Sequence, residues 1–304
     1  MQPLNAVMKK RLAEFVDRDR EIARFCQILD GSNEPPIMAV WGESGMGKTS
    51  LLARMMHECS LRELRKAEVI WKDSNPPDHM AIMRKIRDDV GANHFVSFTD
   101  LVNYYYQEGY QPHVEVNLNL SGIAGISVGE SMRVSDASVG DIAGVVVKDC
   151  MIVIPRQDMA IPETERRARL THRFIEDLKH ALADGPLVVF FDAIEKISKD
   201  TESWLWEQFL DFVRSEQIPN IKFVMCGHRR PPSDRDWRDF IEEMALNPLE
   251  NTDVVLYLEK RFPELSAAEH SSLALLISSM STGNPAKVAN MADAFAKMRE
   301  RQAA

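Results

Sequence analysis

The sequence predicts an α/β protein with three parts: a core on a parallel β-sheet, a β-rich insertion and an all-helical C-terminal lid. Three observations support this fold. Short apolar runs alternate with helical patterns from residue 20 to about residue 245, as expected for parallel strands joined by helices. Residues 112–154 show a period of two instead, and only helical patterns follow. We therefore predict a core over residues 1–245, which includes the insertion 112–154, and a lid over residues 246–304.

Four apolar runs are short enough to be strands of a sheet that is buried on both faces. Pro35 and Pro36 open the first run, and Gly185 and Pro186 open the third. The predicted strands cover residues 37–41, 68–72, 187–192 and 221–226.

Helical periodicity fills most of the remaining chain outside the insertion. The first helix illustrates the pattern, because Ile22, Phe25 and Leu29 share one face and Gly31 then ends the helix. The predicted helices cover residues 20–29, 49–66, 79–90, 98–107, 162–183, 201–216, 251–262, 266–280 and 285–301.

The insertion has the pattern of half-buried antiparallel strands. Four of its apolar residues alternate strictly with polar ones, namely Val114, Val116, Leu118 and Leu120. An apolar face of this kind needs a cover, because a lone hairpin is only marginally stable in water. The cover is either the core itself or another protein subunit, and the pattern leaves both open.

Composition excludes several classes of function. The chain carries 37 basic and 46 acidic residues, a net charge of −9, which argues against a surface devoted to nucleic-acid backbones. Its four cysteines form no CxxC pair, so zinc and thiol redox chemistry have no support. No apolar run approaches the length of a membrane span or a signal peptide. We expect a cytoplasmic protein that binds neither membranes nor nucleic acid.

Residues 42–49 match the phosphate-loop pattern GxxxxGK[ST] in full. Glycines in such a loop let backbone N–H groups surround a β-phosphate, and the helix that follows favours negative charge. Lys48 is expected to reach the β- and γ-phosphate oxygens, and Thr49 to bind Mg²⁺. The motif predicts ATP or GTP with Mg²⁺ as the ligand. The expected nucleotide-binding residues here are Gly42, Glu43, Ser44, Gly45, Met46, Gly47, Lys48, Thr49 and Ser50.

Three more residues join Lys48 as candidate catalytic groups. Asp192 ends the third predicted strand, at the edge where open α/β sheets bind ligands, and is expected to hold Mg²⁺ with Thr49. No glutamate follows it directly, so Glu195 is the candidate general base, with an ordinary surface acid as the alternative. Arg229, which follows the fourth predicted strand, is the candidate that stabilises the transferred charge, ahead of Arg230.

These motifs together resemble the STAND NTPases, a signalling branch related to AAA+ ATPases. Residues 15–21 look like the "FVGRExE" motif of that group, with Asp17 in place of its usual glycine. Residues 190–195 are similar to the NACHT-type second motif, and residues 223–229 to a sensor strand that ends in an arginine. The resemblance implies that Val16 and Arg18 border the adenine pocket. Lid motifs of the NB-ARC and NACHT groups are matched by residues 246–249 and 283–285, which implies that Pro285 lies near the nucleotide.

The expected function is that of a slowly hydrolysing ATPase switch, which acts in signalling or defence through self-assembly or protein partners. Two alternatives remain open. One is an origin-recognition-like AAA+ ATPase that acts on DNA, and the other is a scaffold that keeps its nucleotide without hydrolysing it. Metabolic kinase activity has no acceptor-site signature in this sequence.

Overall fold

The computed structural model describes residues 15–31, 33–70, 77–106, 161–231 and 236–303. These residues form two compact units. The first comprises the described residues up to His94 and from Leu178 onward, and the second is Phe95–Asp177. The predicted β-rich insertion, residues 112–154, lies outside the described residues. The predicted boundary between core and lid, after residue 245, stays a prediction.

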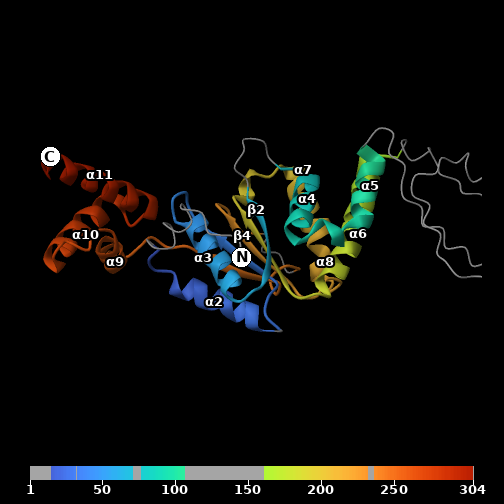
Figure 1. The fold of residues 1–304 in the computed structure, drawn as a ribbon, viewed down its shortest axis with the longest axis horizontal. Helices are drawn as coiled ribbons and strands as arrows, with labels where there is room; N and C mark the ends of the chain where they lie inside the picture. Colours follow the sequence, from blue (N-terminus) through green and yellow to red (C-terminus); the bar gives the residue numbers. More distant parts are fainter. Residues whose placement is uncertain (1–14, 32, 71–76, 107–160, 232–235, 304) are drawn as a thin grey trace, which may run out of the picture. The chain divides into compact units, whose positions relative to one another are not determined.

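The first unit contains a five-stranded sheet in which every pair of neighbouring strands is parallel (Figure 1). This confirms the predicted parallel-sheet core. In spatial order the strands are β2 (Arg65–Ile70), β3 (Leu187–Asp192), β4 (Ile221–Gly227), β1 (Ile37–Trp41) and β5 (Ile241–Ala245). The carboxyl ends of β3, β4 and β1 therefore lie side by side.

Two strands depart from the prediction. Strand β2 begins at Arg65 rather than residue 68, because the preceding helix ends at Leu61 and Glu63 turns the chain with a φ of 56°. Strand β5 was not predicted, since two glutamates interrupt its apolar pattern. It is an edge strand, where charged residues are tolerated. The carboxylate of Glu242 binds Arg24 at 2.7 Å, and that of Glu243 binds Arg230 at 2.5 Å.

The helices lie close to their predicted positions, apart from the interval before β4. There a single predicted helix, residues 201–216, is divided into two short helices by a π-helical turn. The described helices are α2 (Asp19–Asp30), α3 (Lys48–Leu61), α4 (His79–Val90), η1 (Ala92–His94), α5 (Val96–Tyr106), α6 (Glu163–Leu182), η3 (Ile194–Lys196), α7 (Lys199–Trp204), η4 (Leu205–Phe209), α8 (Asp211–Arg214), α9 (Asn251–Arg261), α10 (Ala267–Ser281) and α11 (Pro285–Ala303).

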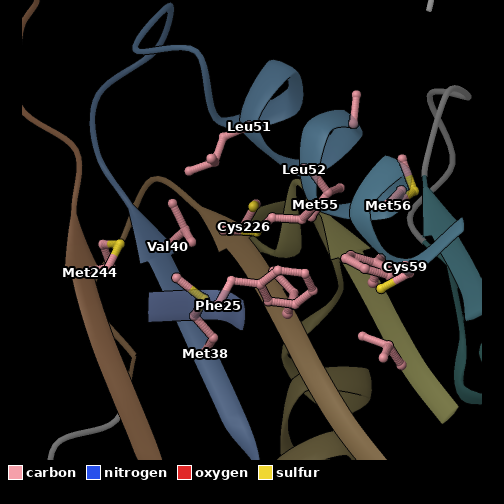
Figure 2. Close-up of a cluster of buried hydrophobic side chains, with 14 of the residues drawn as sticks. Phe25, Met38, Val40, Leu51, Leu52, Met55, Met56, Cys59, Cys226 and Met244 are labelled. Atoms are coloured by element: carbon pink, nitrogen blue, oxygen red, sulfur yellow. The ribbon is translucent and has the colours of Figure 1, made fainter. Parts of the chain in front are cut away.

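Both faces of the sheet are covered. On one face, α2 and α3 bury a cluster against alternate strand residues, which Figure 2 shows in part. Phe25 of α2 lies in this cluster, as do Met38 and Val40 of β1. On the other face, Phe209 of η4 packs edge-on against Phe223 of β4, with ring centroids 5.9 Å apart. Alternation along each strand explains both layers, because successive side chains point to opposite faces.

Helices α9, α10 and α11 follow the sheet and confirm the predicted helical C-terminal segment. They share an apolar cluster of their own, in which Val254, Leu258 and Ile277 are buried. Val16, from the N-terminal segment, packs against this cluster, whereas its neighbour Phe15 packs against the sheet cluster.

The second unit is built on α5 and the first part of α6. The rings of Phe95 and Phe98 each pack on Phe174, with centroids 5.1 and 5.2 Å away. The buried carboxylate of Asp177 accepts a hydrogen bond from the backbone N–H of Phe98 at 2.8 Å. This bond satisfies one of the free N–H groups at the start of α5. No described helix is both long and apolar enough to cross a membrane.

Candidate nucleotide site

The phosphate-loop motif connects β1 to α3, as the sequence predicts. Gly45 and Gly47 have φ angles of 81° and 85°, a left-handed region that glycine enters without strain. A Cβ at Gly45 would lie 2.7 Å from the side-chain oxygen of Asn284, so this close contact is a second reason why the position requires glycine. The glycines thus allow the left-handed shape of the loop, which lies at the N-terminus of a helix that favours anions.

Lys48 is buried inside this loop. Its Nζ donates hydrogen bonds to the backbone carbonyls of Gly42 and Glu43, at 2.7 and 2.8 Å. Burial lowers the pKa of Lys48 below its ordinary value, and the nearby carboxylates of Glu195 and Asp192 oppose that shift. The amine therefore lies in a site where an added anion would relieve the cost of burying its charge.

Thr49, in the first turn of α3, meets Asp192 at the end of β3. The hydroxyl of Thr49 donates to Oδ2 of Asp192 at 2.8 Å, although the two residues are 143 positions apart in the chain. Mg²⁺ prefers oxygen ligands at 2.0–2.1 Å in an octahedron, so adjacent ligand oxygens lie about 2.9 Å apart. The pair fits that separation and chemistry. The described residues contain no cluster of three His, Cys, Asp or Glu side chains that would form a metal site of its own.

Glu195 reaches the same edge through a tight turn. Ala193 has a φ of 57° and begins the turn η3 directly after β3. One carboxylate oxygen of Glu195 accepts the backbone N–H of His228 at 3.2 Å, and the other lies 3.5 Å from Nε2 of the same histidine. A Cβ at Gly227 would come within 2.7 Å of the Ile194 side chain, so only glycine allows this approach.

The two arginines after β4 have different surroundings. Arg230 forms a bidentate ion pair with Glu243 of β5, with distances of 2.5 and 3.3 Å. Arg229 is exposed, and no described residue forms an ion pair or hydrogen bond with it. Within the described part of the chain, the Arg230 guanidinium is therefore held at the sheet edge, whereas that of Arg229 has no partner.

The N-terminal residues expected near adenine lie between the sheet and the lid helices. The Arg18 guanidinium is buried and donates to the carbonyl of Asn247 at 2.7 Å. The amine of Lys260, in α9, donates to the carbonyl of Phe15 at 2.6 Å. Asp17 has a φ of 59°, which explains why the resembling motif carries glycine there and why aspartate, which tolerates this region, can replace it.

The lid reaches the phosphate loop through the N-terminus of α11. Asn284 donates its amide N–H to the carbonyl of Ser44, and the backbone N–H of Ala286 donates to that of Gly45, each at 3.0 Å. Pro285 lies between them, 3.9 Å from where a Cβ of Gly47 would be. Asn284 also accepts the N–H of Lys287 at 3.2 Å and so caps α11.

Sequence reasoning identified Pro285 but not its two neighbours as site residues. The signal for Asn284 was present, because an asparagine directly before a proline and a helical pattern is a typical N-cap. Its contact with Ser44 could not be seen, since 240 positions separate the two residues.

Comparison with known proteins assigns the chain to a protein family. A family model described as the AAA ATPase domain matches residues 14–215. No curated protein matches the chain.

The chain is also similar to several solved structures, three of which are described here. A STAND protein with a tetratricopeptide repeat sensor, from Pyrococcus horikoshii, is 13% identical with a TM-score of 0.44. The match covers 89% of this chain but only 28% of that protein. A chain of the HORMA:CdnC:Trip13 complex from E. coli MS115-1 is 11% identical with a TM-score of 0.47, covering 91% of this chain and 78% of the other. Cdc6p from Pyrobaculum aerophilum is 13% identical with a TM-score of 0.45, covering 90% and 55%.

Proposed function

Because the chain belongs to the AAA ATPase domain family, we propose that it is an ATP-dependent switch of the STAND type. It binds ATP with Mg²⁺, hydrolyses it slowly, and changes the position of its lid with the state of the nucleotide. One observation supports this proposal above the others: the N-terminus of α11 is hydrogen-bonded to the carbonyls of Ser44 and Gly45, within the phosphate loop itself.

Each candidate residue has a role in the proposed hydrolysis. Water attacks the γ-phosphorus, the bond from that phosphorus to the β–γ bridging oxygen breaks, and ADP leaves with that oxygen. Glu195 takes the proton of the attacking water. Lys48 turns from the loop carbonyls to the β- and γ-phosphate oxygens, and Arg229 stabilises charge on the transferred group. Thr49 and Asp192 would hold Mg²⁺, which neutralises charge on the phosphate oxygens.

The lid contacts provide a route from nucleotide to conformation. The phosphate loop has one set of backbone groups for the phosphates and another, the carbonyls of Ser44 and Gly45, bound to the lid. A loop that shifts when phosphate binds would strengthen or weaken these two bonds. We propose that the resulting lid position controls self-assembly or the binding of protein partners in signalling or defence.

The site assignment is tested with Lys48→Ala in a calorimetric titration of ATP with Mg²⁺. Lys222→Ala is the matched control, because Lys222, a half-buried lysine of β4, is another lysine whose pKa is lowered by burial. Loss of ATP binding in the first variant, with binding retained in the second, is the expected result. Wild-type affinity in Lys48→Ala would overturn the site.

Two other functions are separated by further measurements. An origin-recognition-like ATPase acting on DNA predicts a salt-sensitive shift of duplex DNA by the purified protein. A non-hydrolysing scaffold predicts that bound ATP is recovered intact after incubation with Mg²⁺. The switch predicts phosphate release without DNA, together with different hydrogen exchange at the start of α11 in the ATP- and ADP-bound states.

A further inference from the structure

His228 directly follows strand β4 and faces the candidate base, Glu195. The two residues are 33 positions apart in the chain. They meet because β3 and β4 are neighbouring parallel strands, whose carboxyl ends lie at the same edge of the sheet. Glu195 belongs to the turn η3, which begins two residues after the end of β3. The fold therefore brings an imidazole to the carboxylate that has a proposed catalytic role.

Two contacts from His228 reach the two different oxygens of this carboxylate. The backbone N–H donates to Oε2 of Glu195 at 3.2 Å, and Nε2 of the ring lies 3.5 Å from Oε1. The last torsion of a glutamate side chain has broad, two-fold preferences, so a single contact leaves the carboxylate free to turn about its final bond. A second contact, on the other oxygen, removes that freedom. The imidazole thus fixes an orientation that the backbone N–H alone leaves open.

The ring nitrogen that faces Glu195 is a donor in two forms of histidine. Nε2 carries hydrogen in one neutral tautomer and also in the imidazolium. At 3.5 Å the contact is longer than a typical hydrogen bond, and contacts around catalytic groups commonly shorten when substrate binds. The contact between ring and carboxylate is therefore attractive in either form.

The carboxylate of Glu195 depends on His228 for its polar contacts. In the part of the chain that the structure describes, no other residue forms a hydrogen bond or an ion pair with this carboxylate. Lys48 is near enough for the two charges to act on each other, but its Nζ donates to the carbonyls of Gly42 and Glu43. Lys48 therefore does not hold the carboxylate in one orientation.

The location of Glu195, as distinct from its orientation, is set by the backbone. A Cβ at Gly227 would lie 2.7 Å from Cγ2 of Ile194 and 3.3 Å from Oε2 of Glu195, so η3 lies directly against the end of β4. The side chain of His228 is 46% exposed, whereas that of Glu195 is only 18% exposed. Removal of the imidazole therefore leaves the turn in place and opens no cavity in the core.

We propose that His228 is a positioning residue for the candidate base: its imidazole holds Glu195 in the orientation that takes the proton of the attacking water. The proton passes from water to the carboxylate, and the ring neither accepts it nor contacts the nucleotide. This proposal rests on the proposed function, in which Glu195 is the base. Orientation is set by the imidazole, whereas location is set by Gly227 and the N–H of His228.

The first test compares three variants of His228 by phosphate release at saturating ATP with Mg²⁺ and by calorimetric ATP titration. His228→Ala is expected to lower kcat about 10- to 100-fold, the cost of a catalytic group about 1 Å out of place, with unchanged ATP affinity. The amide nitrogen of glutamine reaches the position of Nε2, so His228→Gln should keep kcat within about 3-fold of wild type. Asparagine is shorter, so His228→Asn should match His228→Ala.

His94→Ala is the matched control. Nδ1 of this partly exposed histidine lies 3.8 Å from the carboxylate of Asp184, which precedes the amino end of β3, so the pair resembles that of His228 and Glu195 but lies outside the candidate site. This variant is expected to hydrolyse ATP like wild type. Retained ATP binding confirms that each variant is folded.

The possible failures can be told apart. Wild-type kcat in His228→Ala beside an impaired Glu195→Gln would overturn this proposal alone, as would a loss of ATP affinity in His228→Ala or a His228→Gln variant no faster than His228→Ala. A wild type that releases no phosphate, or a Glu195→Gln variant that hydrolyses ATP normally, would overturn the proposed hydrolysis and the role of His228 with it.

The second test asks whether His228 acts through Glu195. His228→Ala is added to Glu195→Gln, and the double variant is compared with Glu195→Gln in single turnovers of ATP. The added substitution is expected to slow hydrolysis by less than about 2-fold, because the effects of residues that act as one unit do not add. A further loss as large as that of His228→Ala in the wild-type background would mean that the ring acts on another group, and would contradict the positioning role.

Discussion

Glu195 is held at the candidate site by contacts with its two carboxylate oxygens. One oxygen accepts the backbone N–H of His228, and the other faces the imidazole of the same residue. These contacts place a carboxylate beside Lys48 and Asp192, whose charges act on one another in the structure. A residue three positions beyond Asp192 can thus reach the same edge of the sheet, because the left-handed Ala193 reverses the chain.

Glu195→Gln is expected to bind ATP with wild-type affinity and to hydrolyse it about 100-fold more slowly or worse. The amide oxygen still accepts the N–H of His228, so the turn keeps its shape, but the group no longer takes a proton from water. Steady-state phosphate release beside calorimetric ATP titration measures both effects. Unimpaired hydrolysis would assign the base to another residue.

Arg229 and Arg230 form a natural pair of variant and control. Arg229→Ala is expected to reduce hydrolysis about 100-fold, the effect of removing one charge-stabilising donor. Arg230→Ala breaks only an exposed ion pair with Glu243, so it should leave turnover unchanged. Phosphate release by the two variants, compared at saturating ATP, is the measurement. Equal effects of both substitutions would remove Arg229 from the mechanism.

At the scale of elements, the contact between α11 and the phosphate loop joins the lid to the candidate nucleotide site. A helix N-terminus has free N–H groups, and α11 directs one of them, from Ala286, at the carbonyl of Gly45. Asn284 adds a side-chain bond to Ser44 while capping the same helix. The lid is therefore joined to the loop by backbone as well as side-chain bonds.

Asn284→Ala removes one cap bond and one loop bond together. Ser266→Ala is the matched control, because Ser266 caps α10 in the same way but is not bonded to the loop. Both variants should lose about 1 kcal/mol of unfolding free energy in urea titrations. Only Asn284→Ala should also lose ATP affinity, by about 3- to 10-fold, which corresponds to one hydrogen bond. Equal ATP affinities in the two variants would show that the hydrogen bond from Asn284 to Ser44 does not contribute to ATP binding.

At the scale of the whole molecule, the second unit has a set of internal contacts of its own. The rings of Phe95, Phe98 and Phe174 pack together, and Asp177 holds the start of α5. At the other end of these helices, the hydroxyl of Tyr106 donates to the carboxylate of Glu163 at 3.2 Å. The two described ends that flank the predicted insertion therefore lie close together.

Replacing residues 113–153 with a short Gly/Ser linker should consequently leave a folded chain. Its thermal transition is expected to remain single and cooperative, and its ATP affinity unchanged, because the linker only has to bridge neighbouring helix ends. Light scattering then shows whether any oligomer or partner complex is lost with the segment. Collapse of the thermal transition would instead mean that the segment covers the core.

Local patterns in the sequence were enough to predict the parallel-sheet core, four of its strands and the phosphate loop. A strand between turn residues, a glycine loop and a helix follow one another within a few residues. Local sequence patterns therefore predict each of these elements. Strand β5 was not predicted, because Glu242 and Glu243 interrupt its apolar pattern. The arginines that bind these two glutamates, Arg24 and Arg230, can be identified only from the tertiary structure.

Only the tertiary structure decided how distant residues meet. The order of the strands places Asp192 against Thr49, and the packing of the lid places Asn284 against Ser44. These bonds join residues 143 and 240 positions apart, and no periodicity or motif encodes such a separation. The sequence alone determined which chemical groups the site has available, whereas the fold determined which of them share it, because long-range contacts form only when the sheet and the lid are packed.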